Sequence, residues 1–247
     1  MKISKLRSRW IILLSMLYTL NASVRAVSMR LFGKINRPWV DTTIDRWINR
    51  LLDIVGVKCT VINPYNVEPQ PGKATIIMCN HASVYDIPIS YKVFPNHSIR
   101  MLAKKELSKI PLFGKGMAAA EFPFIDRRNR SNALKDLQYV RELMESGIVI
   151  WIAPEGTRST DGKLAPFKKG AFVTAIEAKA TIIPIGIRGA FDILPARSTQ
   201  FNLNQTAEVH IGKAVDASEY TLENKEELIE RIYQSMKELV GEQKEPS

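Results

Sequence analysis

His81 and Asp86 are the two residues of this sequence whose types and spacing most clearly suggest catalysis. They follow an apolar, β-branched run at residues 74–79 that predicts a buried strand, and helical periodicity begins near Ile87. Within one helix the two side chains would lie on different faces, because each residue turns the helix by about 100°. They can meet if His81 lies in the strand-to-helix loop and Asp86 in the first helical turn. Asp86 would then bind one imidazole nitrogen, and the other could take a proton from a substrate hydroxyl.

Two other interpretations of this region remain open. Asp86 lies three residues after Ser83, as in a capping box, so its carboxylate could serve only to bind backbone N–H groups. Cys79 and His81 are two residues apart at the end of the strand and would point to the same side. Such a pair could carry an acyl group covalently, as in a thioesterase. However, Cys79 lies in an apolar run, which favours an inert core thiol.

A second group of residues has the chemistry of an anion site. Glu155, Gly156, Thr157 and Arg158 follow the apolar strand predicted at residues 148–153. A glycine beside a hydroxyl and an arginine lets backbone N–H groups approach an anion that the guanidinium binds through two hydrogen bonds. Three further cations near predicted strand ends are Lys104, Lys105 and Arg127. Together these residues predict a pocket for a phosphate monoester, although residues 155–158 alone could be a surface turn with a local ion pair.

Strands and helices alternate along the body of the chain. Strands are predicted at residues 57–62, 74–79, 98–103, 148–153 and 181–187, with an edge strand at 208–211. Helices are predicted at residues 114–120, 129–145, 170–180 and about 222–240. This alternation predicts an α/β fold, with a mostly parallel or mixed sheet flanked by helices. Because such folds bind ligands at strand ends, both groups of candidate residues are well placed.

The composition is that of a globular protein in a reducing compartment. The 247 residues are 45% hydrophobic and 24% charged, enough for one α/β domain with an extension or for two small domains. Two cysteines give no disulfide framework, and the three histidines lack the spacing of metal ligands. The net charge is +10, and the first 50 residues hold ten Lys or Arg against only Asp41 and Asp45. This basic arm could bind nucleic acid or an anionic membrane, but no nucleic-acid motif is present and we expect no such partner.

Apolar residues in the basic arm favour a membrane. Residues 10–20 form an apolar run that as a helix is about 16 Å long, too short for a hydrocarbon core of about 30 Å. Residues 39–55 place apolar side chains on one stripe and charged ones on the other face. Two such helices predict an interfacial anchor at residues 1–56, followed by a catalytic domain at residues 57–247. The alternatives are a secretory signal, which Arg25 near the cleavage position disfavours, and packing of the second helix on the core.

Four segments in this order resemble the glycerophosphate acyltransferase superfamily. They are His81 with Asp86, residues 124–127, residues 154–158 and the apolar strand around Pro184. The resemblance covers roughly residues 57–215, and within the superfamily it points to the bacterial 1-acylglycerol-3-phosphate acyltransferases. Three positions depart from the family pattern and bear on substrate binding: Glu121 replaces a glycine, Pro123 an apolar residue and Ala153 an aromatic one.

The resemblance implies acyl transfer from acyl-CoA or acyl carrier protein to the free hydroxyl of a lysophospholipid, which gives phosphatidic acid. His81 would be the general base and Asp86 would orient it. Arg158 with Lys105 and Lys104 would hold the acceptor phosphate, and Glu155, Gly156 and Thr157 would shape that loop with support from Arg127. No metal or organic cofactor is implied. The expected location is the cytoplasmic side of the inner membrane, with peripheral or monotopic attachment through residues 1–56. Another lysolipid or glycerol-3-phosphate as acceptor remains an alternative.

Overall fold

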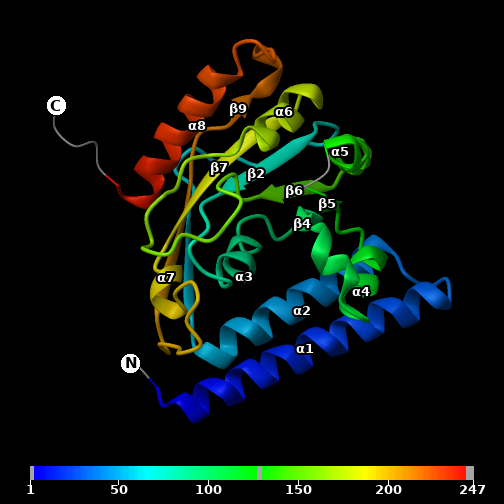
Figure 1. The fold of residues 1–247 in the computed structure, drawn as a ribbon, viewed down its shortest axis with the longest axis vertical. Coiled ribbons are helices and arrows are strands. Elements are labelled where there is room, and N and C mark those ends of the chain that lie inside the picture. The colour runs from blue at the N-terminus through cyan, green and yellow to red at the C-terminus, as the bar shows by residue number, and fades with distance from the viewer. Residues whose placement is uncertain (1–2, 127–129, 243–247) are drawn as a thin grey trace.

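A seven-stranded mixed sheet forms the centre of the protein in the computed structural model, which describes residues 3–126 and 130–242 (Figure 1). In order across the sheet its main strands are β1 (Lys58–Ile62), β8 (Thr206–Ile211), β7 (Thr181–Arg188), β2 (Thr75–Cys79), β6 (Val149–Ile152) and β3 (Ile99–Met101). A short strand, β9 (Val215–Asp216), pairs with the start of β7. Neighbouring strands are parallel except where β7 meets β8 and β9. The predicted α/β fold with a parallel or mixed sheet is therefore confirmed.

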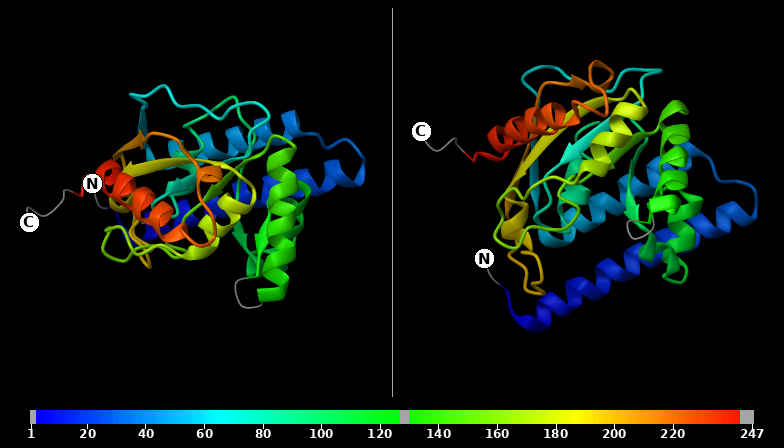
Figure 2. Two further views of the ribbon diagram at one scale, coloured as in Figure 1. Left: turned by 90° about the horizontal axis from the view of Figure 1, so that it is seen from above. Right: turned by 45° about the horizontal axis from the view of Figure 1, so that its top comes forward.

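Helices cover both faces of this sheet (Figures 1 and 2). The helices are α1 (Lys5–Leu31), α2 (Arg37–Val55), α3 (Asp86–Ser90), α4 (Phe113–Ala119), α5 (Arg130–Glu145), α6 (Lys169–Glu177), α7 (Ala190–Ile193) and α8 (Lys225–Val240). All five residues of β2 are buried, and they alternate between two cores: Ile77 packs with apolar residues of α2, and Ile76 packs with those of α5, α6 and α8. Burial on both sides explains why β2 is continuously apolar.

Two strands differ from their predictions. The edge strand expected at residues 208–211 is β8, which lies inside the sheet because β1 pairs with it on the outer side. The strand expected at residues 98–103 is divided between β3 and a second, two-stranded sheet of β4 (Ala103–Lys104) and β5 (Phe124–Ile125). Short 3₁₀ helices follow at Lys105–Lys109 and Ala217–Glu219. Both differences are matters of pairing between distant segments, which local periodicity does not determine.

The N-terminal helix is longer than its apolar run. α1 has 27 residues and begins after Ser4, whose side chain accepts a hydrogen bond from the backbone N–H of Arg7. At 1.5 Å per residue it is about 40 Å long, and by length and composition it could cross a membrane. The predicted helix length of about 16 Å is therefore wrong, because the helix continues through polar residues such as Asn21 and Arg25. It nevertheless lies along the body, antiparallel to α2 and against α4 (Figure 1).

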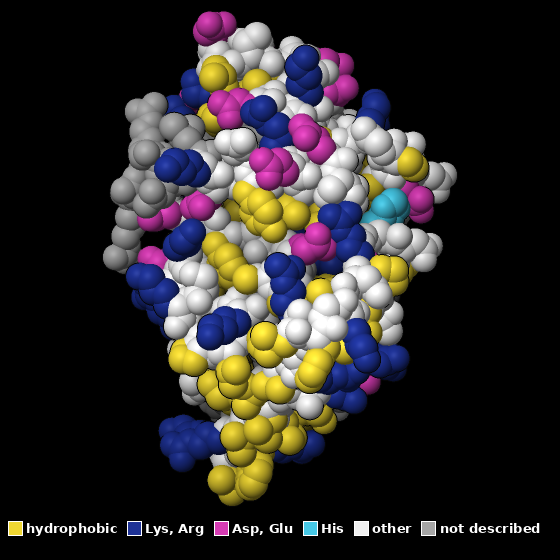
Figure 3. Space-filling model, turned by 90° about the vertical axis from the view of Figure 1, so that its right-hand side faces the viewer, with side chains coloured by type: hydrophobic (Ala, Val, Ile, Leu, Met, Phe, Trp, Pro, Cys, Tyr) yellow, Lys and Arg dark blue, Asp and Glu magenta, His cyan; other side chains and the backbone are white. Residues whose placement is uncertain are grey.

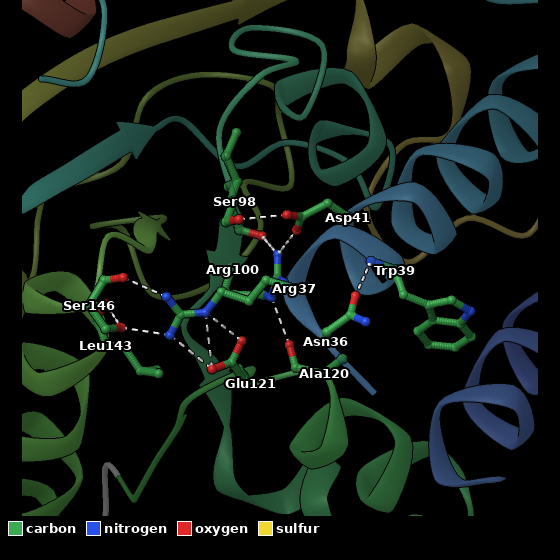
Figure 4. Close-up of polar contacts among 11 residues, drawn as sticks. Asn36, Arg37, Trp39, Asp41, Ser98, Arg100, Ala120, Glu121, Leu143 and Ser146 are labelled. Carbon is green, nitrogen blue, oxygen red and sulfur yellow. Dashed lines mark hydrogen bonds and ion pairs between the residues drawn. The ribbon is translucent and has the colours of Figure 1, made fainter. Parts of the chain in front are cut away.

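A polar network ties α2 to the strands near the predicted substrate site (Figure 4). The fully buried Arg100 of β3 donates to the Asp41 carboxylate at 2.7 Å and to the backbone carbonyl of Ala120 at 2.7 Å. Arg37 at the start of α2 forms an ion pair with Glu121, whose backbone has a φ of +63°. Glu121 lies three residues before β5, at a backbone position with positive φ that usually favours glycine. Its side chain, which a glycine would lack, binds α2 through Arg37.

Candidate active site

The His81 loop, residues 80–85, follows β2 in the middle of the sheet and leads directly into α3. Asn80 fixes the start of this loop: its side chain donates to the carbonyl of Ile187 and accepts from the N–H of the same residue, at 3.0 and 2.7 Å. These two bonds mimic a strand pair with β7. Asn80 was not among the predicted site residues. The only feature of the sequence that could have indicated its role is its position directly before His81.

His81 and Asp86 form the hydrogen bond that their spacing allows. Nδ1 of His81 lies 2.9 Å from Oδ2 of Asp86, which is fully buried. The same oxygen accepts from the backbone N–H groups of Ala82 and Ser83, both at 2.7 Å. Asp86 therefore both organises the backbone of the loop and binds the imidazole. Half of the capping box forms, because the Asp86 carboxylate accepts from the N–H of Ser83, whereas the Ser83 hydroxyl accepts from the N–H of Tyr85 and donates to the carbonyl of Leu194.

This geometry defines which ring nitrogen of His81 is available. A carboxylate bound at Nδ1 favours the tautomer with a proton on Nδ1, which leaves a lone pair on Nε2. Nε2 has no hydrogen-bonding partner among the described residues, and the side chain is 18% exposed. The ring of Trp151 in β6 contacts the imidazole edge to face, with 6.1 Å between centroids. The ring is thus held by Asp86 and Trp151 and can accept a proton at Nε2.

Glu155 lies beneath the His81 loop and connects it to the segment after β6. One carboxylate oxygen accepts from the backbone N–H of His81 at 2.6 Å, and the other from that of Ala165 at 2.9 Å. The N–H of Ser159 donates to the carbonyl of His81 at 2.7 Å. Burial raises the pKa of Glu155 to about 7, with a smaller contribution from Asp86 and with the two backbone donors opposing it. Glu155 therefore supports the loop from inside, and its side chain is only 2% exposed.

The glycine after Glu155 is required by the backbone. Gly156 has a φ of +76°, in the left-handed region that side chains disfavour, and its N–H donates to the carbonyl of Ala153 in a tight turn. The turn leaves Thr157 and Arg158 exposed. Residues 155–158 are therefore more than a surface turn with a local ion pair, because their first residue is buried against the His81 loop.

The remaining predicted phosphate ligands lie on β4 and just after it. Lys104 ends β4 and is exposed, opposite Ile125 of β5, so the second motif segment lies beside it. Lys105 is exposed too, and its Nζ lies 3.4 Å from a carboxylate oxygen of Asp136 in α5. Arg127 falls outside the described residues. In the described part of the chain no hydrogen bond or ion pair joins Lys104 or Arg158 to the His81 loop, and their common phosphate pocket stays a prediction.

Cys79 is poorly suited to covalent catalysis. Its side chain is fully buried at the end of β2, and burial raises the pKa of the thiol well above its ordinary value. The negative charges of Asp86 and Glu155 raise it further. Because the thiolate is the nucleophilic form, this environment disfavours attack on a substrate. Among the described residues no group of three or more His, Cys, Asp or Glu could hold a metal ion.

The protein is in the class of α/β proteins with a mostly parallel sheet and a histidine–aspartate pair at the end of a central strand. Comparison with known proteins gives the family within this class. The profile of the acyltransferase family matches residues 58–188. The chain is 33% identical to the 1-acyl-sn-glycerol-3-phosphate acyltransferase of Haemophilus influenzae over 205 residues, 81% of each chain. It belongs to the acyltransferase family.

Other relatives extend the comparison. A putative 1-acyl-sn-glycerol-3-phosphate acyltransferase of Caenorhabditis elegans is 32% identical over 70% of this chain, which spans only 61% of that protein. The match to a Chlamydomonas reinhardtii acyltransferase spans 41% of that protein. The crystal structure of the 1-acyl-sn-glycerophosphate (LPA) acyltransferase PlsC of Thermotoga maritima has the same fold, with a TM-score of 0.76, 24% identity and 97% of both chains covered.

Proposed function

We propose that the protein transfers an acyl group from a thioester to the free hydroxyl of 1-acylglycerol-3-phosphate, giving phosphatidic acid. The observation that carries this proposal is the pairing of His81 Nδ1 with buried Asp86, which leaves Nε2 as a proton acceptor. The names of the relatives, including the Haemophilus protein, support 1-acylglycerol-3-phosphate as the acceptor. Acyl-CoA and acyl carrier protein are the two proposed donors.

The reaction needs two proton transfers, and His81 can carry out both. Nε2 removes the proton of the acceptor hydroxyl while its oxygen attacks the thioester carbonyl and forms a tetrahedral intermediate. Asp86 stabilises the imidazolium that results. When the intermediate collapses, the carbon–sulfur bond breaks and the imidazolium returns its proton to the leaving thiolate. Neither a metal ion nor an organic cofactor takes part in this scheme.

The acceptor phosphate is proposed to bind the exposed cations. Glu155 holds the turn at Gly156 against the His81 loop through its bond to the N–H of His81. Arg158 follows two residues after Gly156, so its backbone is fixed by this turn. Lys104 and Lys105 extend from the β4–β5 sheet. Charge-assisted hydrogen bonds from such groups to a phosphate are short and strong. Thr157 would contribute at the same turn, and Arg127 is proposed to support it.

The proposed setting is the cytoplasmic face of the inner membrane, with monotopic attachment. α1 exposes apolar side chains on the face turned away from α2 and α4, and these are Leu6, Trp10, Leu13, Met16, Leu17, Leu20, Val24 and Leu31. In Figure 3 hydrophobic side chains gather at the end of the molecule where Figure 1 places α1, with Lys and Arg beside them. Contact of α1 with the body along its length favours a helix lying in the interface over one crossing the bilayer. Protease accessibility of both chain ends on opposite sides of a sealed vesicle would contradict this orientation.

One assay tests the proposed reaction. Purified full-length protein is mixed with labelled palmitoyl-CoA or palmitoyl acyl carrier protein and with an acceptor in detergent. The acceptors are 1-acylglycerol-3-phosphate, glycerol-3-phosphate, lysophosphatidylcholine and monoacylglycerol. We expect labelled phosphatidic acid with the first acceptor and little product with the others. Preference for glycerol-3-phosphate or another lysolipid would replace the proposed acceptor, and release of free fatty acid without acceptor would indicate a thioesterase.

A further inference from the structure

A cleft between α1 and α2 brings three arginines together. Arg25 of α1 and Arg46 and Arg50 of α2 line it, with the rings of Tyr18 and Trp47. None of its lining residues is an Asp or a Glu. We call this feature the arginine cleft. Its residues are separate from those proposed to bind the acceptor phosphate.

Among residues 3–126 and 130–242 none of these three arginines forms an ion pair, and two of the acidic residues of α2 have other partners. Asp41 binds the buried Arg100, and Asp45 lies 3.6 Å from Lys92. Asp53, one turn beyond Arg50, has no ion pair in the same described part. Three cations that share one cleft without a counter-charge repel each other, so an anion bound between them would be stabilised.

Aromatic contacts hold two of the guanidinium groups in place. Arg25 lies over the ring of Trp39 at 5.8 Å, and Arg50 lies over the ring of Tyr18 at 5.2 Å. Each guanidinium carbon thus lies over an aromatic face, which attracts its positive charge. Trp47 joins the two helices by donating from Nε1 to the Thr19 hydroxyl at 3.0 Å. Aromatic contacts therefore restrain two of the three guanidinium groups, and all three arginines are exposed to a ligand.

The arginine cleft borders the apolar face of α1. Leu17, Leu20 and Val24 are among the exposed side chains of that face, and Arg25 follows Val24 by about 100° around the helix. A phosphodiester in the cleft would have hydrocarbon directly beside it. From the uncompensated charge, the stacked guanidinium groups and this neighbouring apolar face, we infer that the arginine cleft binds the phosphate of an anionic phospholipid in the leaflet. The inference rests on the proposed membrane attachment and is independent of the acyl transfer.

Vesicle binding by the full-length protein tests the cleft. Cosedimentation is measured with vesicles of phosphatidylcholine alone and of phosphatidylcholine with phosphatidylglycerol. One variant carries Arg25→Gln, Arg46→Gln and Arg50→Gln, and a matched control carries Arg7→Gln, Arg9→Gln and Arg30→Gln, which remove the same charge from exposed positions of α1 outside the cleft. We expect the cleft variant to lose about tenfold more affinity for the anionic vesicles than the control does.

A charge-conserving variant separates a site from diffuse attraction. Arg25→Lys, Arg46→Lys and Arg50→Lys keep the charge but lose the stacking and the paired N–H donors. We expect this variant to fold and to bind anionic vesicles about three- to tenfold more weakly than the native protein. Equal binding, or an equal loss in the Gln control, would overturn the inference. If the Lys variant loses binding of inorganic phosphate in solution but binds anionic vesicles as well as the native protein does, the ligand is free phosphate and the lipid source is wrong.

Activity on acceptor in detergent keeps the two proposals apart. Because the cleft residues are separate from the proposed catalytic and acceptor-binding residues, we expect the Lys variant to acylate 1-acylglycerol-3-phosphate in detergent at the native rate. Loss of vesicle binding with full detergent activity supports the cleft. Vesicle binding by the Lys variant equal to that of the native protein would count against the cleft alone, and absence of acyl transfer by the native protein would count against the proposed reaction alone.

Discussion

The His81 loop and the candidate phosphate ligands differ in how tightly the fold holds them. Asp86 and Glu155 are buried, and their carboxylates accept hydrogen bonds from the loop and from the segment after β6. Lys104 and Arg158 are exposed and extend from strand or turn ends. A base must be held within about 0.5 Å of its productive position, and this requires a supporting set of fixed contacts. Long cationic side chains can instead close on a phosphate as it arrives.

The largest expected effect comes from removing the base. His81→Ala should lower kcat by about 10²–10⁴-fold, because the hydroxyl then loses its proton acceptor. The measurement is steady-state acylation of 1-acylglycerol-3-phosphate, with thermal unfolding as the check on folding. His97→Ala, in the loop before β3, is the matched control and should remain active. Near-native turnover by folded His81→Ala protein would contradict the general-base mechanism.

Asp86→Asn tests whether the buried carboxylate acts through the imidazole. The oxygen of Asp86 that binds Nδ1 of His81 also accepts from the N–H groups of Ala82 and Ser83, so an asparagine oxygen in its place can keep these contacts. The neutral amide, however, does not stabilise the imidazolium that forms when Nε2 takes up the proton. We expect kcat to fall at least about 10²-fold with little change in KM. Asp161→Asn, at an exposed loop position, is the control, and equal activity of the two variants would show that orientation by Asp86 is unimportant.

Arg158→Gln tests the exposed side of the comparison. Loss of a charge-assisted contact to phosphate should raise the KM for 1-acylglycerol-3-phosphate about ten- to a hundredfold, with the KM for the acyl thioester nearly unchanged. Arg141→Gln on the exposed side of α5 removes the same charge and should have little effect. If neutral monoacylglycerol serves the native protein as well as the phosphorylated acceptor does, the phosphate assignment is wrong.

The smallest expected effect is on the pH dependence of the free energy of unfolding, and it is tested with Glu155→Gln. The pKa of Glu155 is about 7 in the folded protein against an ordinary value of 4.5, so the folded state binds this proton more tightly than the unfolded chain. The resulting stability is present below about pH 4.5 and is lost as the pH rises towards 7. Glutamine resembles the protonated acid and does not titrate.

Urea unfolding at pH 5 and pH 8 measures this difference. The native protein should lose about 1–3 kcal/mol relative to Glu155→Gln across that range, since each pKa unit corresponds to about 1.4 kcal/mol. Parallel stability curves for the two proteins would show that Glu155 is ionised throughout. In that case its two backbone N–H donors outweigh its burial, and the carboxylate supports the His81 loop as a fixed negative charge.

The sequence by itself determined the parts of this protein that depend on neighbouring residues. The apolar run of β2, the loop at His81 and the start of α3 lie within a dozen residues, and the contact between His81 and Asp86 follows from them. The alternation of strands and helices likewise determined the fold class, because both periodicities are local. The order of the four motif segments sufficed to indicate the family, which the comparisons then showed.

Only the tertiary structure decided contacts between distant segments. It placed Glu155 beneath the His81 loop, put β8 inside the sheet and joined Arg100 to Asp41 across 59 residues. It also continued α1 well past its apolar run, because α2 and α4 pack against the polar end of that helix. Each of these depends on which surfaces meet after the chain collapses, and burial then sets the pKa of Glu155 and the partner of Arg100. Periodicity specifies which face of an element is apolar, whereas packing specifies what covers that face.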